Sequence, residues 1–472
     1  MRIVGRKGEQ ALLKKVLGSN RAEFLVVYGR RRVGKTYLIK EFFRETFSFY
    51  VTGVQSRRAK DEISVFHRAL LRYGSKESSL PADWFEAFDR LAGLIETKVI
   101  SADPKYGKLI LFFDELPWLD SGNGNFKAGL DYFWNSFLST RDDVLLIVCG
   151  SATSWILTNL LYSTGGFYKR VTCRMNIRPF TLQETEELVN DVNGNSLSRK
   201  DLVDAYMVFG GIPHYLNMID PEFSLAQNID NLFFKNGGQL EKEYEELFAS
   251  LFKKYDAHMK IVTALSAKKK GLTRTELLAE TKMSSGATFT KILSELETCG
   301  FIRKYADFKT KKNDSIYQLT DPFILFSFNF LRERRFSLWE HFIDQPGYNA
   351  WSGYAFEMVC INHIPQIKHA LGIDGIDSLD YSFSDNRPGG AQIDLLIDRR
   401  DSVINLCEIK YGSDEYVIDE KYEEVLQNKI QVFKEVTKTK KAIVLTLISM
   451  NGLRMNRHSG VIRKVLTMND LF

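Results

Sequence analysis

Long apolar runs alternate with amphipathic segments over the first 160 residues of the chain. The apolar runs are EFLVVYG, KLILFFDEL and VLLIVCGS, and the segments YLIKEFF and DYFWNSFL between them show the spacing of amphipathic helices. Continuous runs of Val, Ile, Leu and Phe are typical of strands that are buried on both faces of a parallel sheet. The pattern therefore predicts a doubly wound α/β domain over residues 1–180.

The pattern changes to helices after residue 180. Thr181 and Glu184 have the spacing of a capping box, which places the start of a helix there. The segment DLVDAYMVFG is predicted to form a second amphipathic helix, which ends at Gly210 and Gly211. Residues 181–250 are therefore expected to form a small helical lid.

Residues 251–345 follow the order helix, helix, helix and hairpin. The helices are predicted in HMKIVTALSA, TRTELLAE and SSGATFTKILSELE, and the strands FIRKYAD and DSIYQLT flank the basic turn FKTKKN. This order is that of a winged helix-turn-helix, with SSGATFTKILSELE as its recognition helix and KYADFKTKKND as its wing.

The last segment, residues 346–472, returns to a mixed pattern. A helix is predicted at SGYAFEMVCINHI and another from roughly residue 420 to 436, and strands are predicted at AQIDLLID, VINLCEIK and KAIVLTLI. We therefore expect a C-terminal α/β domain.

Composition places the chain among ordinary globular proteins. Apolar residues make up 44% and charged residues 26% of its 472 residues, and this length predicts roughly three domains of about 150 residues each. The net charge of +5 is too small to indicate a nucleic-acid partner by itself. The N-terminus lacks the apolar core of a secretion signal, no segment is apolar enough to span a membrane, and the five cysteines are scattered. A cytoplasmic protein is expected.

The stretch VVYGRRRVGKTYLIKEFF carries the first candidate site, between a predicted strand and a predicted helix. Gly29, Gly34, Lys35 and Thr36 match the pattern GxxxxGKS/T. The main-chain amides of such a loop and the helix N-terminus stabilise a phosphate group, while Lys35 would reach the β and γ phosphates and the Thr36 hydroxyl would bind Mg²⁺. A glycine-rich turn on a fold that binds no nucleotide is the alternative. The candidate ATP-binding residues of this stretch are Gly29, Arg30, Arg31, Arg32, Val33, Gly34, Lys35, Thr36 and Tyr37.

Polar residues near later strands complement this loop. Asp114 and Glu115 end an apolar strand, where open α/β sheets bind ligands, so Asp114 is expected to bind ATP-associated Mg²⁺ and Glu115 to orient and polarise the attacking water. Ser151 is a candidate sensor of the γ-phosphate, and Arg170 is a candidate arginine finger for the nucleotide of the same or a neighbouring subunit. The alternatives are a solvated strand end, a simple helix cap and a solvated arginine.

Together, these motifs resemble the archaeal-type ATPase family within the STAND branch of AAA+ P-loop proteins. VGRKGEQALLKKVL is similar to its N-terminal box, YGRRRVGKT to its Walker A motif, FFDELPWL to its Walker B motif, KRVTCRMNIRPF to its arginine-containing segment and FGGIPHYL to its GGxPxYL motif. The resemblance implies that Arg170 acts on the nucleotide and that Gly210, Gly211 and Pro213 form a hinge or lid contact. The chain departs from the family pattern at Lys169, where the family usually has glycine.

A second candidate site lies in the C-terminal segment. Asp394 lies on one predicted strand and Glu408 and Lys410 on the next, where alternation points Glu408 and Lys410 to the face that Asp394 can join. Two carboxylates that share a Mg²⁺ beside a lysine are the minimum for metal-assisted phosphodiester hydrolysis. The pattern resembles the PD-(D/E)xK nuclease superfamily in a DUF234-like domain, which adds Glu357 as an upstream metal ligand, although Ile393 replaces the usual proline. A surface cluster of salt bridges is the alternative.

DNA is a candidate partner of the predicted winged helix. The basic residues of this region are Lys282, Lys291, Arg303, Lys304, Lys309, Lys311 and Lys312. They could contact phosphates, but Glu295 and Glu297 on the predicted recognition helix argue against it.

The sequence as a whole predicts an ATP-binding and ATP-hydrolysing switch protein with a DNA-binding or nuclease-like C-terminal module. The expected cofactors are ATP and Mg²⁺. The expected partners are ATP or ADP, DNA at the winged helix and the C-terminal domain, and further copies of the chain in a nucleotide-dependent homo-oligomer. The other hypothesis is a nucleotide-gated signalling or scaffold protein whose C-terminal domain binds a partner without cleavage.

Overall fold

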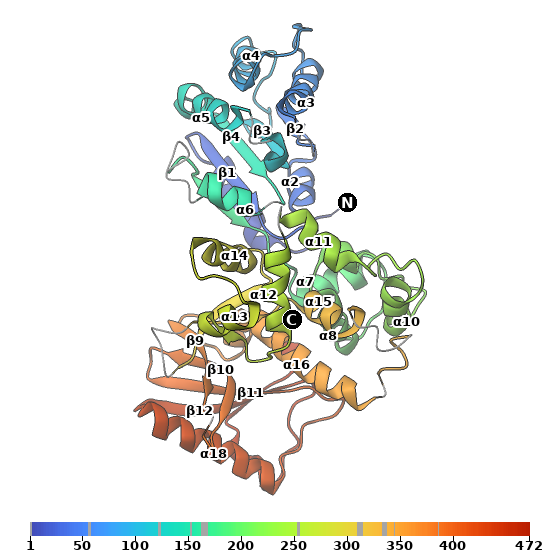
Figure 1. The fold of residues 1–472 in the computed structure, drawn as a ribbon, viewed down its shortest axis with the longest axis vertical. Coiled ribbons are helices and arrows are strands. Elements are labelled where there is room, and N and C mark those ends of the chain that lie inside the picture. Colours follow the sequence, from blue (N-terminus) through green and yellow to red (C-terminus); the bar gives the residue numbers. More distant parts are fainter. Residues whose placement is uncertain are drawn as a thin grey trace. The chain divides into compact units, whose positions relative to one another are not determined.

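The chain forms two compact units. The first contains Met1–Arg178 and Ala249–Lys253, and the second contains Pro179–Phe248 and Lys254–Phe472. The computed structural model describes residues 2–54, 58–120, 124–151, 153–161, 169–252, 255–308, 315–332, 338–343, 345–385 and 387–472 (Figure 1). The helical segment after residue 180 therefore belongs to the same compact unit as the C-terminal segments.

A parallel sheet forms the centre of the first unit. Its strands are β1 (Glu23–Tyr28), β2 (Phe49–Thr52), β3 (Leu109–Asp114), β4 (Val144–Cys149) and β5 (Cys173–Asn176). They lie in the order β2-β3-β4-β1-β5, and every neighbouring pair is parallel. The expected α/β fold with a parallel sheet is therefore confirmed. The apolar runs did not predict β2 and β5, because each strand has only four residues.

Both faces of this sheet are covered, which explains the unbroken apolar runs. On one face, Phe24, Leu111 and Leu146 belong to a hydrophobic cluster with residues of α3, α4 and α5. Alternate strand residues such as Leu25 and Phe112 are also fully buried, and they point to the opposite face. The helices of this unit are α1 (Lys7–Leu17), α2 (Lys35–Phe43), α3 (Ala59–Arg72), α4 (Trp84–Glu96), α5 (Phe126–Ser136) and α6 (Thr153–Ile156).

The second unit begins with a helical segment. Its helices are α7 (Leu182–Glu186), α8 (Arg199–Phe209), α9 (Pro213–Leu216), α10 (Leu225–Ile229) and α11 (Glu243–Leu251), whose last three residues are counted in the first unit. The capping box of Thr181 and Glu184 is present at the start of α7, and α8 ends at Gly210, whose φ is 68°. Within this unit, α8 packs against α15 (Pro322–Phe326) and α16 (Pro346–Asn362).

Three helices and a small antiparallel sheet follow. They are α12 (Asp256–Ser266), α13 (Arg274–Thr281) and α14 (Ala287–Thr298), with β6 (Leu272–Thr273), β7 (Ile302–Ala306) and β8 (Ser315–Leu319) in the order β6-β8-β7. Glu295 on α14 is buried, and its Oε2 lies 2.7 Å from Nε2 of His258 on α12. Residues 309–314, which include three lysines of the predicted wing, lie outside the described residues.

The C-terminal part of the second unit contains another five-stranded sheet. Its strands are β9 (Ser378–Ser384), β10 (Gln392–Arg399), β11 (Val403–Lys410), β12 (Ala442–Ser449) and β13 (Lys464–Leu466), in the order β13-β12-β11-β10-β9. β10 is antiparallel to β9 and β11, whereas β12 is parallel to β11. The remaining helices are α17 (Ile364–Ala370) and α18 (Glu420–Thr437).

Two details of this part differ from the sequence-based expectation. α16 begins at Pro346, ahead of the predicted segment SGYAFEMVCINHI, because proline is well tolerated in the first turn of a helix. β9 was not predicted, since its sequence SLDYSFS is mostly polar and only Phe383 is fully buried among its residues.

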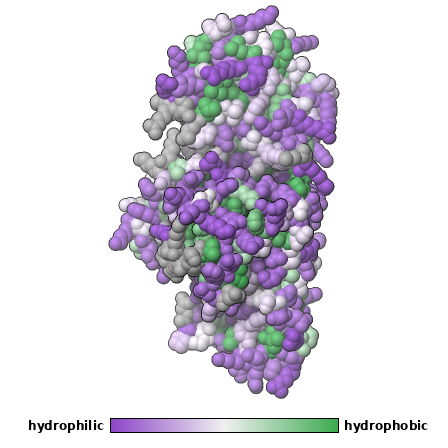
Figure 2. All heavy atoms as spheres, turned by 90° about the vertical axis from the view of Figure 1, so that its right-hand side faces the viewer, coloured by the Kyte–Doolittle hydropathy of each residue, from purple (hydrophilic) through white to green (hydrophobic). Residues whose placement is uncertain are grey.

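The face drawn in Figure 2 is largely polar. On the face drawn in Figure 2, hydrophobic side chains (green) form small separate groups among hydrophilic ones (purple). Within the part of the chain that the structure describes, no helix has the length and apolar composition needed to cross a membrane.

Candidate functional site

The loop between β1 and α2 has a geometry that depends on its glycines. Gly29 has a φ of 137°, and a Cβ atom there would lie 2.3 Å from the Ile177 carbonyl oxygen, so a larger residue would clash with the main chain. Gly34 has a φ of 88° and directly precedes α2, which begins at Lys35. The loop therefore ends at a helix N-terminus, where main-chain amides favour an anion.

Lys35 is held against this loop by its own main chain. The residue is only 6% exposed, and its Nζ donates hydrogen bonds to the carbonyl oxygens of Gly29 (3.0 Å) and Arg30 (2.8 Å). These bonds offset the cost of burying an ammonium group. They keep its positive charge beside the loop.

Thr36 links the loop to the end of β3. Its Oγ1 donates a hydrogen bond to Asp114 Oδ1 at 2.9 Å, and the main-chain amide of Glu115 donates to the same oxygen at 3.0 Å. Burial raises the pKa of Asp114 above its ordinary value, and the bond from Thr36 opposes that rise. The two oxygen ligands predicted for Mg²⁺ therefore lie side by side, and oxygen is the ligand atom that Mg²⁺ prefers.

Glu115 is fixed by the end of the neighbouring strand. Ser151 follows β4, and both its main-chain amide (3.1 Å) and its Oγ (2.9 Å) donate hydrogen bonds to Glu115 Oε2. This contact follows from the strand order, because β4 lies between β1 and β3 and its carboxyl end adjoins both. The structure thus brings together the residues predicted at three strand ends.

The other predicted residues of the loop differ in exposure. Arg31 and Tyr37 are exposed, Arg32 is half-buried with a φ of 69°, and Val33 is buried. The carbonyl oxygen of Val33 accepts a hydrogen bond from Nη2 of Arg6 at 3.1 Å. Arg6 was not singled out from the sequence, although it lies in the N-terminal segment VGRKGEQ, whose resemblance to the family box was its only signal.

Arg170 lies at the opposite edge of the sheet from this loop. It precedes the amino end of β5, where the Thr172 amide donates to the Phe24 carbonyl oxygen at 3.1 Å near the start of β1. The loop follows the carboxyl end of β1, which is roughly 16 Å away at the rise of a strand. The structure therefore does not bring Arg170 to the loop of its own chain.

Arg178, unlike Arg170, lies at the edge of the sheet where the glycine-rich loop begins. The Ile177 amide donates to the Tyr28 carbonyl oxygen at 2.8 Å, so the next residue, Arg178, follows β5 at the edge where the loop begins. Its side chain is exposed. The sequence signal was its place directly after a strand, which is visible only once β5 is known.

Residues 3–219 match the model of a family described as an ATPase domain predominantly from Archaea. This part of the chain is an archaeal-type ATPase domain. The match spans the glycine-rich loop, the acidic end of β3 and the first helices of the second unit.

Curated relatives and solved structures also resemble the chain. An uncharacterized protein of Methanocaldococcus jannaschii is 25% identical over 362 residues, which are 75% of this chain and 76% of that protein. An uncharacterized ATP-binding protein of the same organism is 51% identical over 39 residues, which are 8% of this chain and 66% of that protein. The Walker-type ATPase of Pyrococcus abyssi has a TM-score of 0.47 and 18% identity, and the match covers 70% of this chain and 96% of that structure.

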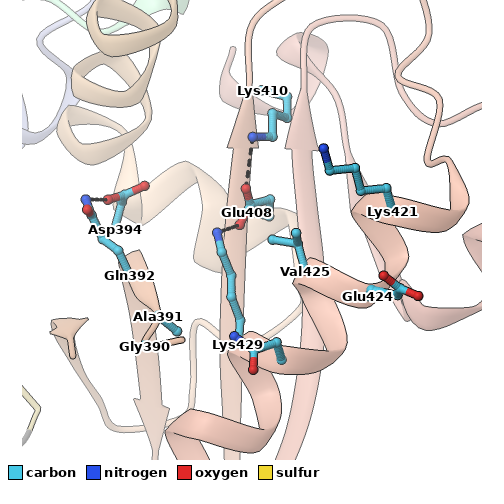
Figure 3. A pocket seen from close by; sticks show the side chains of 11 residues that line it. Gly390, Ala391, Gln392, Asp394, Glu408, Lys410, Lys421, Glu424, Val425 and Lys429 are labelled. Carbon is cyan, nitrogen blue, oxygen red and sulfur yellow. Dashed lines mark hydrogen bonds and ion pairs between the residues drawn. The ribbon is translucent and has the colours of Figure 1, made fainter. Parts of the chain in front are cut away.

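Outside the ATPase domain, an open pocket of about 690 Å³ lies over β10, β11 and α18 (Figure 3). It is lined by Gly390, Ala391, Gln392, Asp394, Glu408, Lys410, Lys421, Glu424, Val425, Asn428 and Lys429. Leu395 pairs with Cys407 across the two strands, and the same register continued by one residue places Asp394 opposite Glu408. The pocket therefore contains the Asp394, Glu408 and Lys410 predicted from the sequence.

Both carboxylate oxygens of Glu408 have partners, and the residue is only 5% exposed. Oε1 lies 3.0 Å from Lys410 Nζ and accepts a hydrogen bond from Tyr422, while Oε2 lies 2.7 Å from Lys429 Nζ. Burial acts to raise the pKa of Glu408, but Lys429 and Lys410 outweigh it and hold that pKa below its ordinary value. Glu408 is therefore ionised at neutral pH.

Asp394 is half-buried, and its Oδ1 accepts a hydrogen bond from Gln392 Nε2 at 2.7 Å. Glu357, on α16, is close enough for charge coupling to it. Burial and the charge of Asp394 raise the pKa of Glu357 to about 8, so this carboxyl carries a proton at neutral pH.

The described residues contain no group of three or more His, Cys, Asp or Glu side chains close enough to hold a metal ion together. Glu357 is thus not a third ligand beside Asp394 and Glu408 in this structure. Two carboxylates nevertheless suit Mg²⁺, which is commonly held by one or two of them and keeps several waters.

Lys429 and Tyr422, both on α18, were missed from the sequence. They lie seven residues apart, which is two helical turns, so they share one face of the helix. That spacing was a weak signal, because nothing local shows that this face covers Glu408.

Proposed function

We propose that the ATPase domain binds ATP together with Mg²⁺, hydrolyses it, and acts as a nucleotide switch. The observation that carries this proposal is the 2.9 Å hydrogen bond between Thr36 Oγ1 and Asp114 Oδ1. It joins the loop suited to phosphates to the acidic strand end that phosphoryl transfer needs. The similarity to a relative named as an ATP-binding protein supports the same proposal.

Each residue of the site has a role in this proposal. Thr36 and Asp114 would hold Mg²⁺, which when bound neutralises charge on the phosphate oxygens. Lys35 would exchange a carbonyl partner for the β and γ phosphates. Glu115 would orient and polarise the attacking water, and Ser151 would keep the Glu115 carboxylate in place as well as sense the γ-phosphate.

Arg170 would act on the nucleotide of a neighbouring copy, since it lies at the far edge of the sheet from its own loop. This placement supports a nucleotide-dependent homo-oligomer, which we expect in the cytoplasm. The expected signature is an ATPase turnover per chain that rises with protein concentration. Turnover should also be restored when an Arg170→Ala variant is mixed with an Asp114→Asn variant. Strictly concentration-independent turnover would rule out this role.

The ATP site is tested by a matched pair of lysine variants on α2. Lys35→Met should lower the affinity for ATP and Mg²⁺ by roughly 10- to 100-fold, because charge-assisted hydrogen bonds to phosphate are lost. Lys40→Met, on the same helix, should leave it unchanged. Isothermal titration calorimetry measures both, and an unchanged affinity in Lys35→Met would remove the assignment.

We further propose that residues 181–250 form a lid, 251–345 a winged helix-turn-helix and 346–472 a PD-(D/E)xK nuclease-like domain. The order α12, α13, α14, β7, β8 supports the winged helix, and the order α16, β9, β10, β11, α18, β12 supports the nuclease-like core. Glu295 faces inward to His258, so it does not oppose DNA at the exposed face of α14. Lys282, Lys291 and Lys304 are exposed and could contact phosphates, and Lys291 Nζ also lies 3.8 Å from Glu295 Oε1.

The chemistry of the C-terminal pocket supports metal-dependent cleavage of nucleic acid. Asp394 and Glu408 would hold Mg²⁺, which when bound activates water and stabilises charge on the phosphate. Lys410 would position the water or stabilise the developing charge. Three lysines line the pocket together with three carboxylates, including Glu424, so it offers ammonium groups to a phosphodiester as well as ligands to a metal.

A cleavage assay separates this proposal from the scaffold hypothesis, in which the domain binds a partner without cutting it. Plasmid and branched DNA are incubated with the full chain and Mg²⁺ or Mn²⁺, with and without ATP. Wild type should nick them, Asp394→Asn and Lys410→Met should reduce nicking at least about 100-fold, and Lys440→Met, an exposed control, should not. Absence of cleavage by wild type under every condition would favour the scaffold.

A further inference from the structure

The Glu408 carboxylate is fully engaged by positive charge from two elements. Lys410 reaches Oε1 from the same strand at 3.0 Å, and Lys429 reaches Oε2 from α18 at 2.7 Å. Figure 3 shows the two lysines approaching Glu408 from different sides, with both contacts drawn as dashed lines. Any cation that binds Glu408 must therefore displace one of these ammonium groups or share the carboxylate with it.

Lys429 is the partner that differs from the expected nuclease pattern. Its side chain is 16% exposed, compared with 29% for Lys410, so its charge is held more deeply. Tyr422 donates a further hydrogen bond to Glu408 Oε1 from the same helix face. Asp394, across the strands, accepts a hydrogen bond from a neutral partner, Gln392.

We propose that the Lys429 ammonium serves as an internal counter-ion for Glu408, occupying its Oε2 until a divalent cation takes that oxygen. This inference rests on the proposed metal site of Asp394 and Glu408. Lys429 is a positioning residue in this arrangement: it compensates the charge of a buried carboxylate and orients it, and once released it supplies positive charge to the phosphate in the same pocket.

The physical reason is competition for one oxygen atom. A buried carboxylate without a compensating charge is costly, and Lys429 removes that cost when no metal is bound. The same contact lowers the affinity for a divalent ion, because the ion must both displace the ammonium group and bind near its charge. Removal of the lysine charge should therefore tighten metal binding. If Lys429 had only a structural role, its removal would weaken metal binding or leave it unchanged.

The test measures Mn²⁺ binding to the nucleotide-free full-length protein by electron paramagnetic resonance of the free ion. The part of the binding that disappears in Asp394→Asn belongs to the C-terminal site. Lys429→Met should bind Mn²⁺ at this site about tenfold more tightly than wild type. Lys429→Arg, which keeps the charge, should bind as wild type does.

Lys421→Met is the matched control, since Lys421 lies on the same helix and lines the same pocket but is not among the partners of Glu408. It should change the affinity less than about twofold. Thermal melting checks that each variant is folded, and Lys429→Gln replaces Lys429→Met if the latter is not.

Two other results are informative in different ways. Equal or weaker Mn²⁺ binding in Lys429→Met, or an equal gain in Lys421→Met, would overturn the counter-ion role and leave the metal site standing. If Asp394→Asn removes no Mn²⁺ binding from wild type or from the lysine variants, the proposed metal site fails, and the counter-ion role fails with it.

Discussion

Glu357 carries a proton at neutral pH because its surroundings disfavour a negative charge. Burial, together with the charge of Asp394, raises its pKa from 4.5 to about 8 in the folded chain. A carboxyl with a raised folded pKa stabilises the fold fully only below the unfolded value, and this contribution is lost as the pH rises through the folded value. The affected window is therefore about pH 4.5 to 8.

Glu357→Gln removes this titration and leaves a neutral side chain of similar size. At pH 8.5 in EDTA the variant should be more stable than wild type by on the order of 5 kcal/mol, whereas at pH 5 the two should be close. Differential scanning fluorimetry across this pH range measures the change. Glu424→Gln, at an exposed position of the same pocket, is the control, and an equal pH-dependent gain there would refute the assignment.

Single residues were predictable from the sequence where their chemistry is set by near neighbours. The spacing of Gly29, Gly34, Lys35 and Thr36 defines a loop locally, and the alternation of a strand places Glu408 and Lys410 on one face. Lys429 belongs to a helix about 20 residues later in the chain, and its contact with Glu408 depends on how that helix packs, which no local pattern encodes.

At the scale of elements, the strand order explains the site at the glycine-rich loop. β4 lies between β1 and β3, so Ser151 at its end contacts Glu115 at the end of β3. The apolar runs predicted these three strands but not their order, because sheet neighbours are chosen by long-range packing. The short strands β2 and β5 were not predicted because neither has a long apolar run. Without β5, the sequence could not show at which edge of the sheet Arg170 and Arg178 lie.

Because Gly29 approaches Ile177 closely, any side chain at position 29 should lower the stability of the first unit. Gly29→Ala should destabilise the first unit by at least about 2 kcal/mol, since its Cβ would lie 2.3 Å from a carbonyl oxygen at a φ of 137°. Chemical denaturation with and without ATP measures this loss.

Gly8→Ala is the matched control for that substitution. Gly8 lies in α1, and a Cβ atom there would meet nothing within 4 Å. Alanine in a helix is favoured over glycine, so this variant should gain about 0.5 to 1 kcal/mol. Equal stability of the two variants would show that the approach of the main chains at Gly29 is not tight.

At the scale of the whole molecule, the segment after residue 180 is bound into the second unit by buried polar contacts. The Leu182 amide at the start of α7 donates to His363 Nε2 at 2.9 Å, and burial lowers the pKa of His363 to about 4, so this imidazole is a neutral acceptor at neutral pH. Tyr411 Oη donates to Asp204 Oδ1 on α8 at 2.7 Å. The sequence predicted the helices of this segment but could not show which part of the chain they join.

Tyr411→Phe should loosen α8 and the end of β11 together. The substitution leaves the half-buried Asp204 carboxylate with Lys200 as its charged partner and should cost about 1 to 3 kcal/mol. Hydrogen–deuterium exchange should rise in both elements. Tyr348→Phe is the control: the Tyr348 hydroxyl is hydrogen-bonded to that of Tyr411 and not to Asp204, so its loss should have a smaller effect. Faster exchange confined to β11 would show that the two elements are not coupled through this contact.

One peptide bond separates Tyr411, which is anchored to α8, from Lys410, whose amine enters the C-terminal pocket. A displacement of α8 by the rise of one helical residue, about 1.5 Å, would therefore move that amine as well. A shift of this size away from Glu408 would take the amine beyond ordinary hydrogen-bond distance of the carboxylate. The reactivity of the pocket would then follow the position of a helix 207 residues earlier in the chain. In the proposed nuclease, an effector that never touches nucleic acid would in this way be able to set the rate of cleavage.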